Sequence, residues 1–431
     1  TKHCIGKKCT TYENVFNSEK SYIRVAFDFE TNTSEDIEEA GRMNGGAHIA
    51  YLCATYCEEL GSQKHKNAKQ MLNYLQTHFA KSDKTLLLLA HNAGYDFCFL
   101  QEELENYKKM ENGGQLVRAE GSYYGLKFEI HNTYRLIPEP LRRFGELFNL
   151  SVSKEIMPYD LYTTANIKKV FVPLEECLLH LKTKEDRFWF ETNCVEWQCI
   201  NKAREVNIIN YSTEYCVKDV QVLYDGYMVF RKLIFDITEI DCDCMLTLPA
   251  IGHNYCIKEG VFDDVEQLAG ILREYVQNSV CGGRTMVRNN KKCVYKGPME
   301  DFDEVSMYVG AAVKIQGYLR GKAKNFSKEE LADRSLLDAR MQEVSGYHCK
   351  ILITKVGKKY SIPLLNRIED GKRLFTNDMV GHHMFVDKTT LEDLVEFQQV
   401  EYEVVNGIYF NEGWNNTINR VQQGLFDARL K

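Results

Sequence analysis

The sequence predicts an α/β protein in two main regions, which meet between residues 240 and 250. Residues 22–30 are rich in β-branched and aromatic side chains and have the length of one strand. Residues 84–90 are almost entirely apolar and resemble a buried strand, and a tight turn at 91–94 leads from them into a helix. Strand, glycine turn and helix in succession are typical of α/β folds. Beyond the boundary a new pattern of helices and strands begins, which favours a second region.

Hydrophobic spacing also predicts the remaining elements. In the first region we expect strands at 48–57 and 123–130 and helices at 68–79, 139–150 and 207–230. In the second region we expect helices at 251–258 and 265–280 and strands at 285–294 and 299–308. Residues 1–21 lack periodicity and are interpreted as an arm, whereas the charge-rich segment 151–205 is interpreted as a possible insertion.

Composition excludes several classes of protein. The 431 residues are 44% hydrophobic and 27% charged with 7 prolines, which excludes a disordered or collagen-like chain. The longest apolar run, Leu86–Ala90, is too short for a membrane-spanning helix, so no membrane association is expected. No apolar segment typical of a secretory signal begins the sequence, which favours an intracellular location.

The 15 cysteines are an odd number without regular spacing, which favours reduced thiols in a reducing compartment. Zinc binding through Cys4 and Cys9, or through Cys53 and Cys57, stays open as a weaker alternative. The formal net charge of -7 argues against a surface that is basic throughout. Residues 284–296 nevertheless hold five basic and no acidic side chains, which is compatible with a local nucleic-acid contact or with a solvated strand.

Two acidic residues stand two positions apart on the first predicted strand. Because side chains alternate along a strand, Asp28 and Glu30 project from the same face and can share a divalent cation. They close an otherwise apolar run, where charges without partners would be unfavourable. An exposed strand end is the alternative interpretation.

Two further patterns place polar groups near this pair. Asn92, Tyr95 and Asp96 follow the buried strand at 84–90, so Asp96 can reach the same sheet edge, although Asn92 or Asp96 can equally serve as a helix cap. Tyr215 and Asp219 are one helical turn apart and share a helix face. A hydroxyl at Tyr215 could orient a water molecule beside a metal that Asp219 holds.

Together these three segments resemble the motifs of the DEDDy-type 3′–5′ proofreading exonucleases, which have a ribonuclease-H-like fold. The resemblance implies that two Mg²⁺ or Mn²⁺ ions are bound by Asp28, Glu30, Asp96 and Asp219. It implies that Tyr215 positions the attacking water. It also assigns Asn92 and Tyr95 to the binding of the single-stranded 3′ end.

A second resemblance follows the boundary. Residues 301–309 are similar to motif A of the family B DNA polymerases, with Met307 and Val309 in place of the usual leucine and proline. The resemblance makes Asp303 a catalytic metal ligand in an active site with two ions. It also implies that Ser306 and Tyr308 contact the incoming dNTP. The segment Gly282, Gly283 and Arg284 resembles the linking motif of that family and would contact primer-template DNA.

The chain as a whole is most similar to the protein-primed family B polymerases of viruses and linear plasmids. The resemblance implies an arm at 1–21, an exonuclease domain at 22–245, a connector at 246–298 and the N-terminal part of an α+β palm at 299–431. An insertion at about 314–399 would meet a terminal protein that acts as primer. Leu141 and Phe144 stand where this subfamily has a DNA-binding motif, with Pro140 replacing its hydroxyl residue.

The later polymerase motifs, D-T-D and K-x3-N-S-x-Y-G, do not occur in the sequence. We therefore expect a fragment or one half of a split DNA polymerase, which a second polypeptide would complete and which does not extend DNA alone. A stand-alone 3′–5′ exonuclease and a non-catalytic DNA-binding or priming subunit are the alternatives.

Overall fold

The computed structural model describes residues 22–33, 48–151, 155–283, 292–304 and 306–429. The chain divides into two compact units, with the change from one to the other after His253. The predicted arm lies outside the described residues, as does Arg284. None of the described helices combines the length and apolar character that crossing a bilayer requires.

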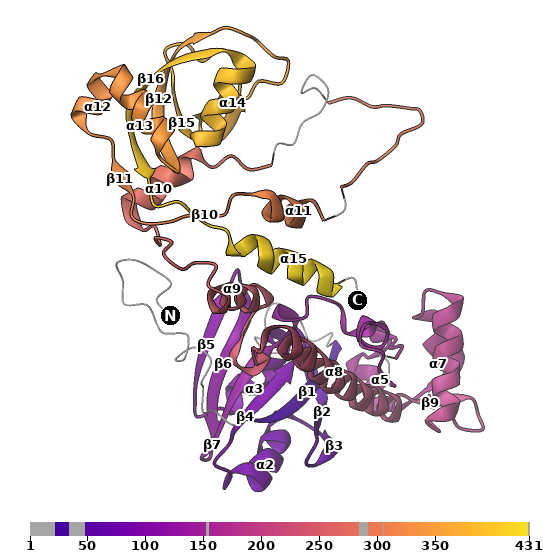
Figure 1. Cartoon of the computed structure of the whole chain (residues 1–431). Coiled ribbons are helices and arrows are strands. Elements are labelled where there is room, and N and C mark those ends of the chain that lie inside the picture. The colour runs from indigo at the N-terminus through magenta and orange to yellow at the C-terminus, as the bar shows by residue number, and fades with distance from the viewer. Residues whose placement is uncertain (1–21, 34–47, 152–154, 284–291, 305, 430–431) are drawn as a thin grey trace. The chain divides into compact units, whose positions relative to one another are not determined.

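The first unit is built on a seven-stranded sheet (Figure 1) in the order β3-β2-β1-β4-β7-β6-β5. Strand β1 is parallel to β4, which is parallel to β7, whereas the other neighbours are antiparallel. The strands are β1 (Tyr22–Thr33), β2 (His48–Cys57), β3 (Gly61–His65), β4 (Thr85–Ala90), β5 (Asn106–Asn112), β6 (Gln115–Tyr123) and β7 (Leu126–Asn132).

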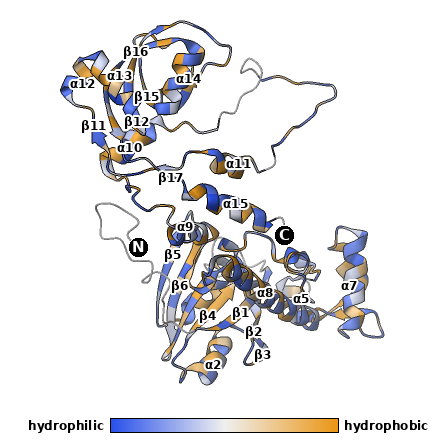
Figure 2. Cartoon of the chain, in the orientation of Figure 1, coloured by the Kyte–Doolittle hydropathy of each residue, from blue (hydrophilic) through white to orange (hydrophobic). Residues whose placement is uncertain are grey.

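Strand β4 lies in the middle of this sheet because its leucine run can be buried on both faces. Residues Leu86–Ala90 are completely buried, and Figure 2 shows the apolar character of this strand. On one face, the apolar side of α2 (Ala68–Phe79) packs through Met71, Leu72 and Leu75. Asn67 caps α2 by accepting a hydrogen bond from the backbone N–H of Gln70.

Helix α8 (Ile208–Thr238) packs against β1 and β2. Its N-cap is Asn207, whose side chain accepts from the N–H of Asn210, and it ends at Glu239 in the left-handed conformation. The other helices of this unit are α3 (Gly94–Leu100), α4 (Phe144–Leu147), α5 (Thr164–Lys169), α6 (Leu174–Leu179) and α7 (Lys184–Glu196). In the segment 151–210, the short strands β8 (Phe171–Pro173) and β9 (Glu205–Asn207) pair with each other in antiparallel orientation.

Two elements that the sequence predicts as continuous are interrupted in this unit. The predicted strand at 123–130 is divided by a turn at Tyr124 and Gly125, both at positive φ, so that β6 ends before it and β7 begins after it. The predicted helix at 139–150 is a 3-10 turn, η3 (Leu141–Arg143), followed by the single helical turn of α4. Helix α9 (Leu248–Lys258) then runs across the boundary between the units.

The second unit contains a four-stranded antiparallel sheet in the order β11-β16-β12-β15. Its strands are β11 (Lys324–Asn325), β12 (Gly346–Val356), β15 (His383–Asp387) and β16 (Val400–Phe410). Helices α12 (Lys328–Ala332), α13 (Arg334–Glu343) and α14 (Lys388–Gln398) accompany it, and buried apolar residues of α13 and α14 join its core. Because β16 pairs with β12 along most of its length, this module continues beyond residue 399.

The second unit has further elements outside that sheet. They are α10 (Gly270–Ser279), α11 (Met307–Lys314), α15 (Thr417–Arg429), and the strand pairs β10 (Tyr318–Leu319) with β17 (Trp414–Asn415) and β13 (Asn366–Glu369) with β14 (Lys372–Phe375). The side-chain amide of Asn419 on α15 donates to the carbonyls of Ala312 and Val313 at 3.0 and 2.8 Å, which fixes α15 to the end of α11.

The predicted strand at 299–308 is wrong. Residues 299–304 have no regular secondary structure, and α11 begins at Met307. A strand requires a neighbour for its backbone N–H and C=O groups, and among the described residues no segment pairs with 299–304. Of the predicted strand at 285–294, the greater part lies outside the described residues.

Candidate functional site

Asp28 and Glu30 occupy the carboxyl end of β1 and project from the same sheet face. Glu30 is 6% exposed and Asp28 is half-buried. Their carboxylate oxygens and the Sγ atom of Cys216 lie within 4.8 Å of one another. The thiol of Cys216 donates to the backbone carbonyl of Asp28 at 3.6 Å, which fixes α8 against β1 at this point. The strand therefore presents two carboxylates to one location, as its alternation predicts.

Asp96 enters the same location from the first turn of α3. Its carboxylate accepts a hydrogen bond from the backbone N–H of Phe29 at 3.2 Å, so α3 is tied to β1 between the two acids. Burial raises the pKa of Asp96 to about 7. A cation beside it would favour the ionised form, so this buried carboxyl group is chemically suited to metal coordination.

Tyr215 and Asp219 approach from α8, one turn apart on its buried face. They are 1% and 2% exposed. The hydroxyl of Tyr215 forms a hydrogen bond of 2.6 Å with the hydroxyl of Tyr159. Burial and the charge of Asp219 raise the pKa of Tyr215 well above its ordinary value, so this hydroxyl keeps its proton at neutral pH.

One cavity of about 520 Å³ is lined by the four acids Asp28, Glu30, Asp96 and Asp219 and by Tyr215, together with the predicted substrate residues Asn92 and Tyr95. Asn92 adopts a φ of 69°, and its backbone N–H donates to the side chain of Asn132 at 3.1 Å, which holds the turn between β4 and α3. The other lining residues are Phe29, Thr31, His48, His91, Leu141, Tyr159 and Leu223. Residues more than 180 positions apart in the sequence thus meet in one acidic cavity.

The site also includes residues that no sequence pattern indicated, namely Thr31, His48, Tyr159 and Cys216. Cys216 follows Tyr215 directly, and its place on the helix face toward β1 is a signal that could have been used. Tyr159 comes from the short 3-10 helix η4 (Tyr159–Leu161) in the segment interpreted as an insertion, where no periodicity indicates its position.

The described residues of the second resemblance lie in the other compact unit. Asp303 and Tyr308 are exposed, with Tyr308 at 83%, and Ser306 precedes α11 in the left-handed conformation with φ 54°. Gly282 and Gly283 are also exposed. All five belong to the compact unit that begins at Asn254, whereas the cavity belongs to the unit that ends at His253.

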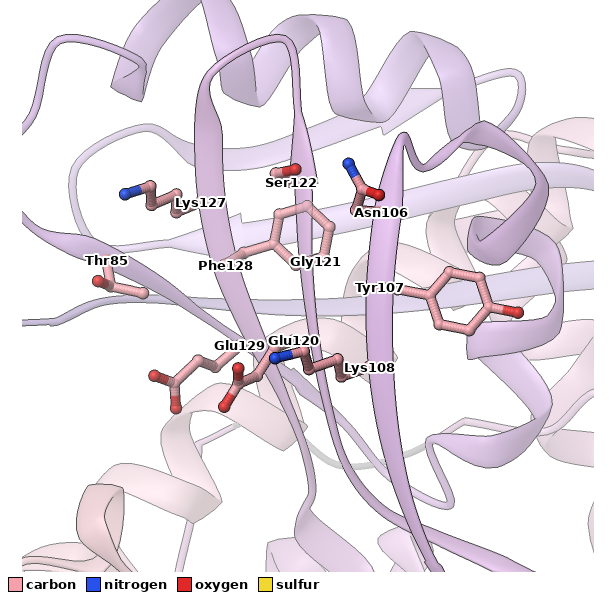
Figure 3. Close-up of a pocket in the computed structure, with 10 residues that line it drawn as sticks. All are labelled: Thr85, Asn106, Tyr107, Lys108, Glu120, Gly121, Ser122, Lys127, Phe128 and Glu129. Atoms are coloured by element: carbon pink, nitrogen blue, oxygen red, sulfur yellow. The ribbon is translucent and has the colours of Figure 1, made fainter.

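A second cavity of the first unit, of about 510 Å³, lies on the sheet at β4 to β7 (Figure 3). Lys108, Glu120 and Glu129 form a row across β5, β6 and β7. Arg118 contacts the carboxylates of Glu120 and Glu129 at 2.7 Å each, and the hydroxyl of Tyr22 donates to Glu129 at 3.2 Å. These acids are thus engaged in a network that joins β1, β6 and β7, which is a structural role.

Comparison with known proteins supplies the family. Residues 77–420, more than half of the chain, match the model of the type B DNA polymerases of organelles and viruses. The chain belongs to this family. The resemblance to family B polymerases that the motifs predicted is thereby confirmed.

Two kinds of relatives accompany this match. A DNA polymerase from Kluyveromyces lactis is 23% identical over 301 residues, which cover 65% of this family B chain and 29% of that protein. Phi29 DNA polymerase, solved as a ternary complex with primer-template DNA and incoming nucleotide, superposes with a TM-score of 0.55 at 14% identity, covering 94% of this chain and 67% of the other. Its complex with single-stranded DNA gives a TM-score of 0.52 at 13% identity, covering 94% and 66%. The likeness shows that this mixed α/β chain with its large central sheet shares the Phi29 fold.

Proposed function

We propose that the chain is the N-terminal part of a family B DNA polymerase, or one half of a split enzyme, and that its first unit is a ribonuclease-H-like 3′–5′ exonuclease. The observation that carries this proposal is the meeting of Asp28, Glu30, Asp96 and Asp219 with Tyr215 in one cavity. Three separate elements supply these groups, and clustering four carboxylates is unfavourable unless a cation compensates their charge.

The donor set fits two divalent cations. Mg²⁺ and Mn²⁺ prefer carboxylate oxygens, which all four acids provide, and Asp28 and Glu30 are close enough to hold one ion between them. When bound, two such ions stabilise the attacking and the leaving oxygen of a phosphodiester displacement. The chain contributes the fixed positions of these carboxylates, through the Phe29–Asp96 hydrogen bond and the packing of α8 on β1.

Tyr215 is suited to orient the attacking water. Its hydroxyl keeps its proton, is buried next to Asp219 and has its direction fixed by Tyr159. A hydroxyl whose direction is fixed in advance can position a neighbouring water without a reorientation cost. Tyr159 is 61% exposed and lines the cavity, so it also lies on the substrate side of Tyr215.

DNA is the substrate that these observations favour. The Phi29 structures hold single-stranded DNA or primer-template DNA with nucleotides, and this chain has their fold. We assign the single-stranded 3′ end to Asn92 and Tyr95 at the cavity. We assign primer-template DNA and a dNTP, with its own pair of ions at Asp303, to the second unit, where Ser306 and Tyr308 also lie. The four-stranded sheet of the second unit, formed by β11, β12, β15 and β16, would with its helices meet a terminal protein.

The experiment measures Mn²⁺ binding and hydrolysis of single-stranded DNA in Asp219→Asn and in Asp225→Asn. Asp225 lies on the same helix, is partly buried and does not line the cavity, so it is the matched control. We expect Asp219→Asn to bind at least one Mn²⁺ fewer and to hydrolyse DNA about 10³-fold or more slowly. Asp225→Asn should keep the Mn²⁺ binding and the rate of wild type. Equal Mn²⁺ binding and activity in the two variants would refute the proposed metal site.

A further inference from the structure

The cavity that holds the four acids is poor in positive charge. Neither lysine nor arginine occurs among the described residues that line it, and His48 and His91 are its two basic side chains. A DNA strand that enters this cavity brings a negative charge with every phosphate. Metal ions held by the four acids would compensate the charge at the bond that is cleaved, whereas the neighbouring phosphates require another hydrogen-bond donor.

His91 is already engaged on both ring nitrogens. Its Nδ1 atom lies 3.1 Å from the hydroxyl of Thr133, and its Nε2 atom lies 2.9 Å from the carbonyl oxygen of Glu139. The ring also contacts Tyr134 and Phe144 edge-on. His91 therefore stabilises the turns around it and has no nitrogen left for a phosphate.

His48 has a different arrangement. Its exposed ring lies edge-on to Tyr95, and its Nδ1 atom is 3.2 Å from the hydroxyl of Tyr95 and 3.4 Å from that of Thr31. The hydroxyls of Thr31 and Tyr95 are themselves 2.7 Å apart. Within the described ranges, no side chain or backbone group forms a hydrogen bond with Nε2 of His48.

The hydroxyl of Tyr95 is placed to donate to Nδ1 of the ring. The hydroxyl of Thr31 can donate to that of Tyr95 across 2.7 Å, which leaves the proton of Tyr95 to be donated to Nδ1 of His48. An imidazole that accepts at Nδ1 carries its proton at Nε2. The cluster of Thr31, Tyr95 and His48 thus holds a ring at the cavity with an N–H group available to an acceptor.

We infer that His48 binds a non-bridging phosphate oxygen of the DNA strand that enters the cavity, through Nε2. This inference rests on the proposed exonuclease function and adds a substrate-binding residue to it. Thr31 and Tyr95 are positioning residues for the ring. The phosphate concerned belongs to a linkage other than the one that the metal ions address.

Three substitutions separate this role from a structural one. Glutamine places an amide near the position of Nε2, whereas asparagine places one near Nδ1, and alanine removes both. We expect His48→Ala and His48→Asn to weaken binding of a 5′-fluorescein-labelled single-stranded dodecamer about tenfold in EDTA and to raise KM with Mg²⁺ by a similar factor, with kcat unchanged. His48→Gln should stay within about threefold of wild type.

Two results would overturn the inference. Rescue by asparagine and not by glutamine would show that His48 acts only by holding Tyr95. Wild-type affinity in all three variants would show that the ring does not touch the strand. If wild type hydrolyses and binds the oligonucleotide while these variants are unaffected, this inference alone fails, whereas a wild type that neither binds nor hydrolyses it would refute the proposed function itself.

A scan of the substrate locates the contact. Methylphosphonate linkages, which lack the phosphate charge, are introduced one at a time into the dodecamer. We expect one linkage at which the substitution weakens binding to wild type about tenfold but has little further effect on His48→Ala. Losses that are equal in the two proteins at every linkage would contradict the proposed contact.

Discussion

The hydroxyl oxygens of Tyr159 and Tyr215 lie 2.6 Å apart, so an exposed tyrosine fixes the direction of a buried one that stands next to Asp219. Removing either hydroxyl should therefore affect the same step. We expect Tyr215→Phe to lower the single-turnover rate of hydrolysis about 100-fold and Tyr159→Phe about tenfold. The double variant should be no slower than Tyr215→Phe, because both substitutions disturb one water position.

Tyr162 offers a matched control for this pair. It is fully buried, its hydroxyl donates to the carbonyl of Ile208 at 3.1 Å, and it does not line the cavity. Tyr162→Phe should reduce the free energy of unfolding by about 1 kcal/mol and leave the rate unchanged. A Tyr159→Phe variant that is as active as Tyr162→Phe would contradict the positioning role of Tyr159.

Gly226 allows α4 to pack closely against α8. A Cβ atom at this position would meet Cδ2 of Phe144 at 2.5 Å. We expect Gly226→Ala to destabilise the first unit by about 1–3 kcal/mol in urea unfolding, despite the better helix propensity of alanine. Gly252 on α9 is the control, because a Cβ there meets nothing within 4 Å and alanine should be neutral or slightly stabilising. Equal behaviour of the two variants would refute this packing argument.

His65 makes the stability of the first unit depend on pH. Burial lowers the pKa of His65 to about 4 from an ordinary value of 6.5. The unfolded chain therefore binds a proton below pH 6.5 that the folded chain does not bind until about pH 4, so stability falls as the pH is lowered through this range. We expect this residue to account for a loss of about 1–2 kcal/mol between pH 7 and pH 5.

Urea unfolding of His65→Gln at both pH values checks this contribution. The variant should lose less stability than wild type over that interval, because its side chain does not titrate. An identical loss in the two proteins would place the pH dependence elsewhere in the chain.

The residues of the candidate site that could be predicted from the sequence are those that lie on regular strands and helices. Asp28 and Glu30 share a face because strands alternate, and Tyr215 and Asp219 share a face because helices repeat about every fourth residue. Asp96 is predicted near them because it follows a buried strand, and the structure shows that this strand is parallel to β1. Local spacing was sufficient in each of these cases.

Other residues reach the site through contacts between distant segments. Tyr159 stands in a short 3-10 turn, and His48 begins β2 with its ring directed by Tyr95. Neither position has a periodicity from which its neighbours follow. The predicted strand at 299–308 failed for a related reason, since its side-chain pattern is local whereas strand formation depends on a pairing partner.

We propose that the first unit removes nucleotides from the 3′ end of DNA at the site formed by its clustered carboxylates. The most direct test incubates a 5′-labelled single-stranded oligonucleotide with Mg²⁺ and either wild type or Asp28→Ala, and follows the products on a denaturing gel. We expect a ladder of progressively shorter labelled products with wild type and intact substrate with Asp28→Ala. A ladder of equal intensity with both proteins, or intact substrate with wild type, would contradict it.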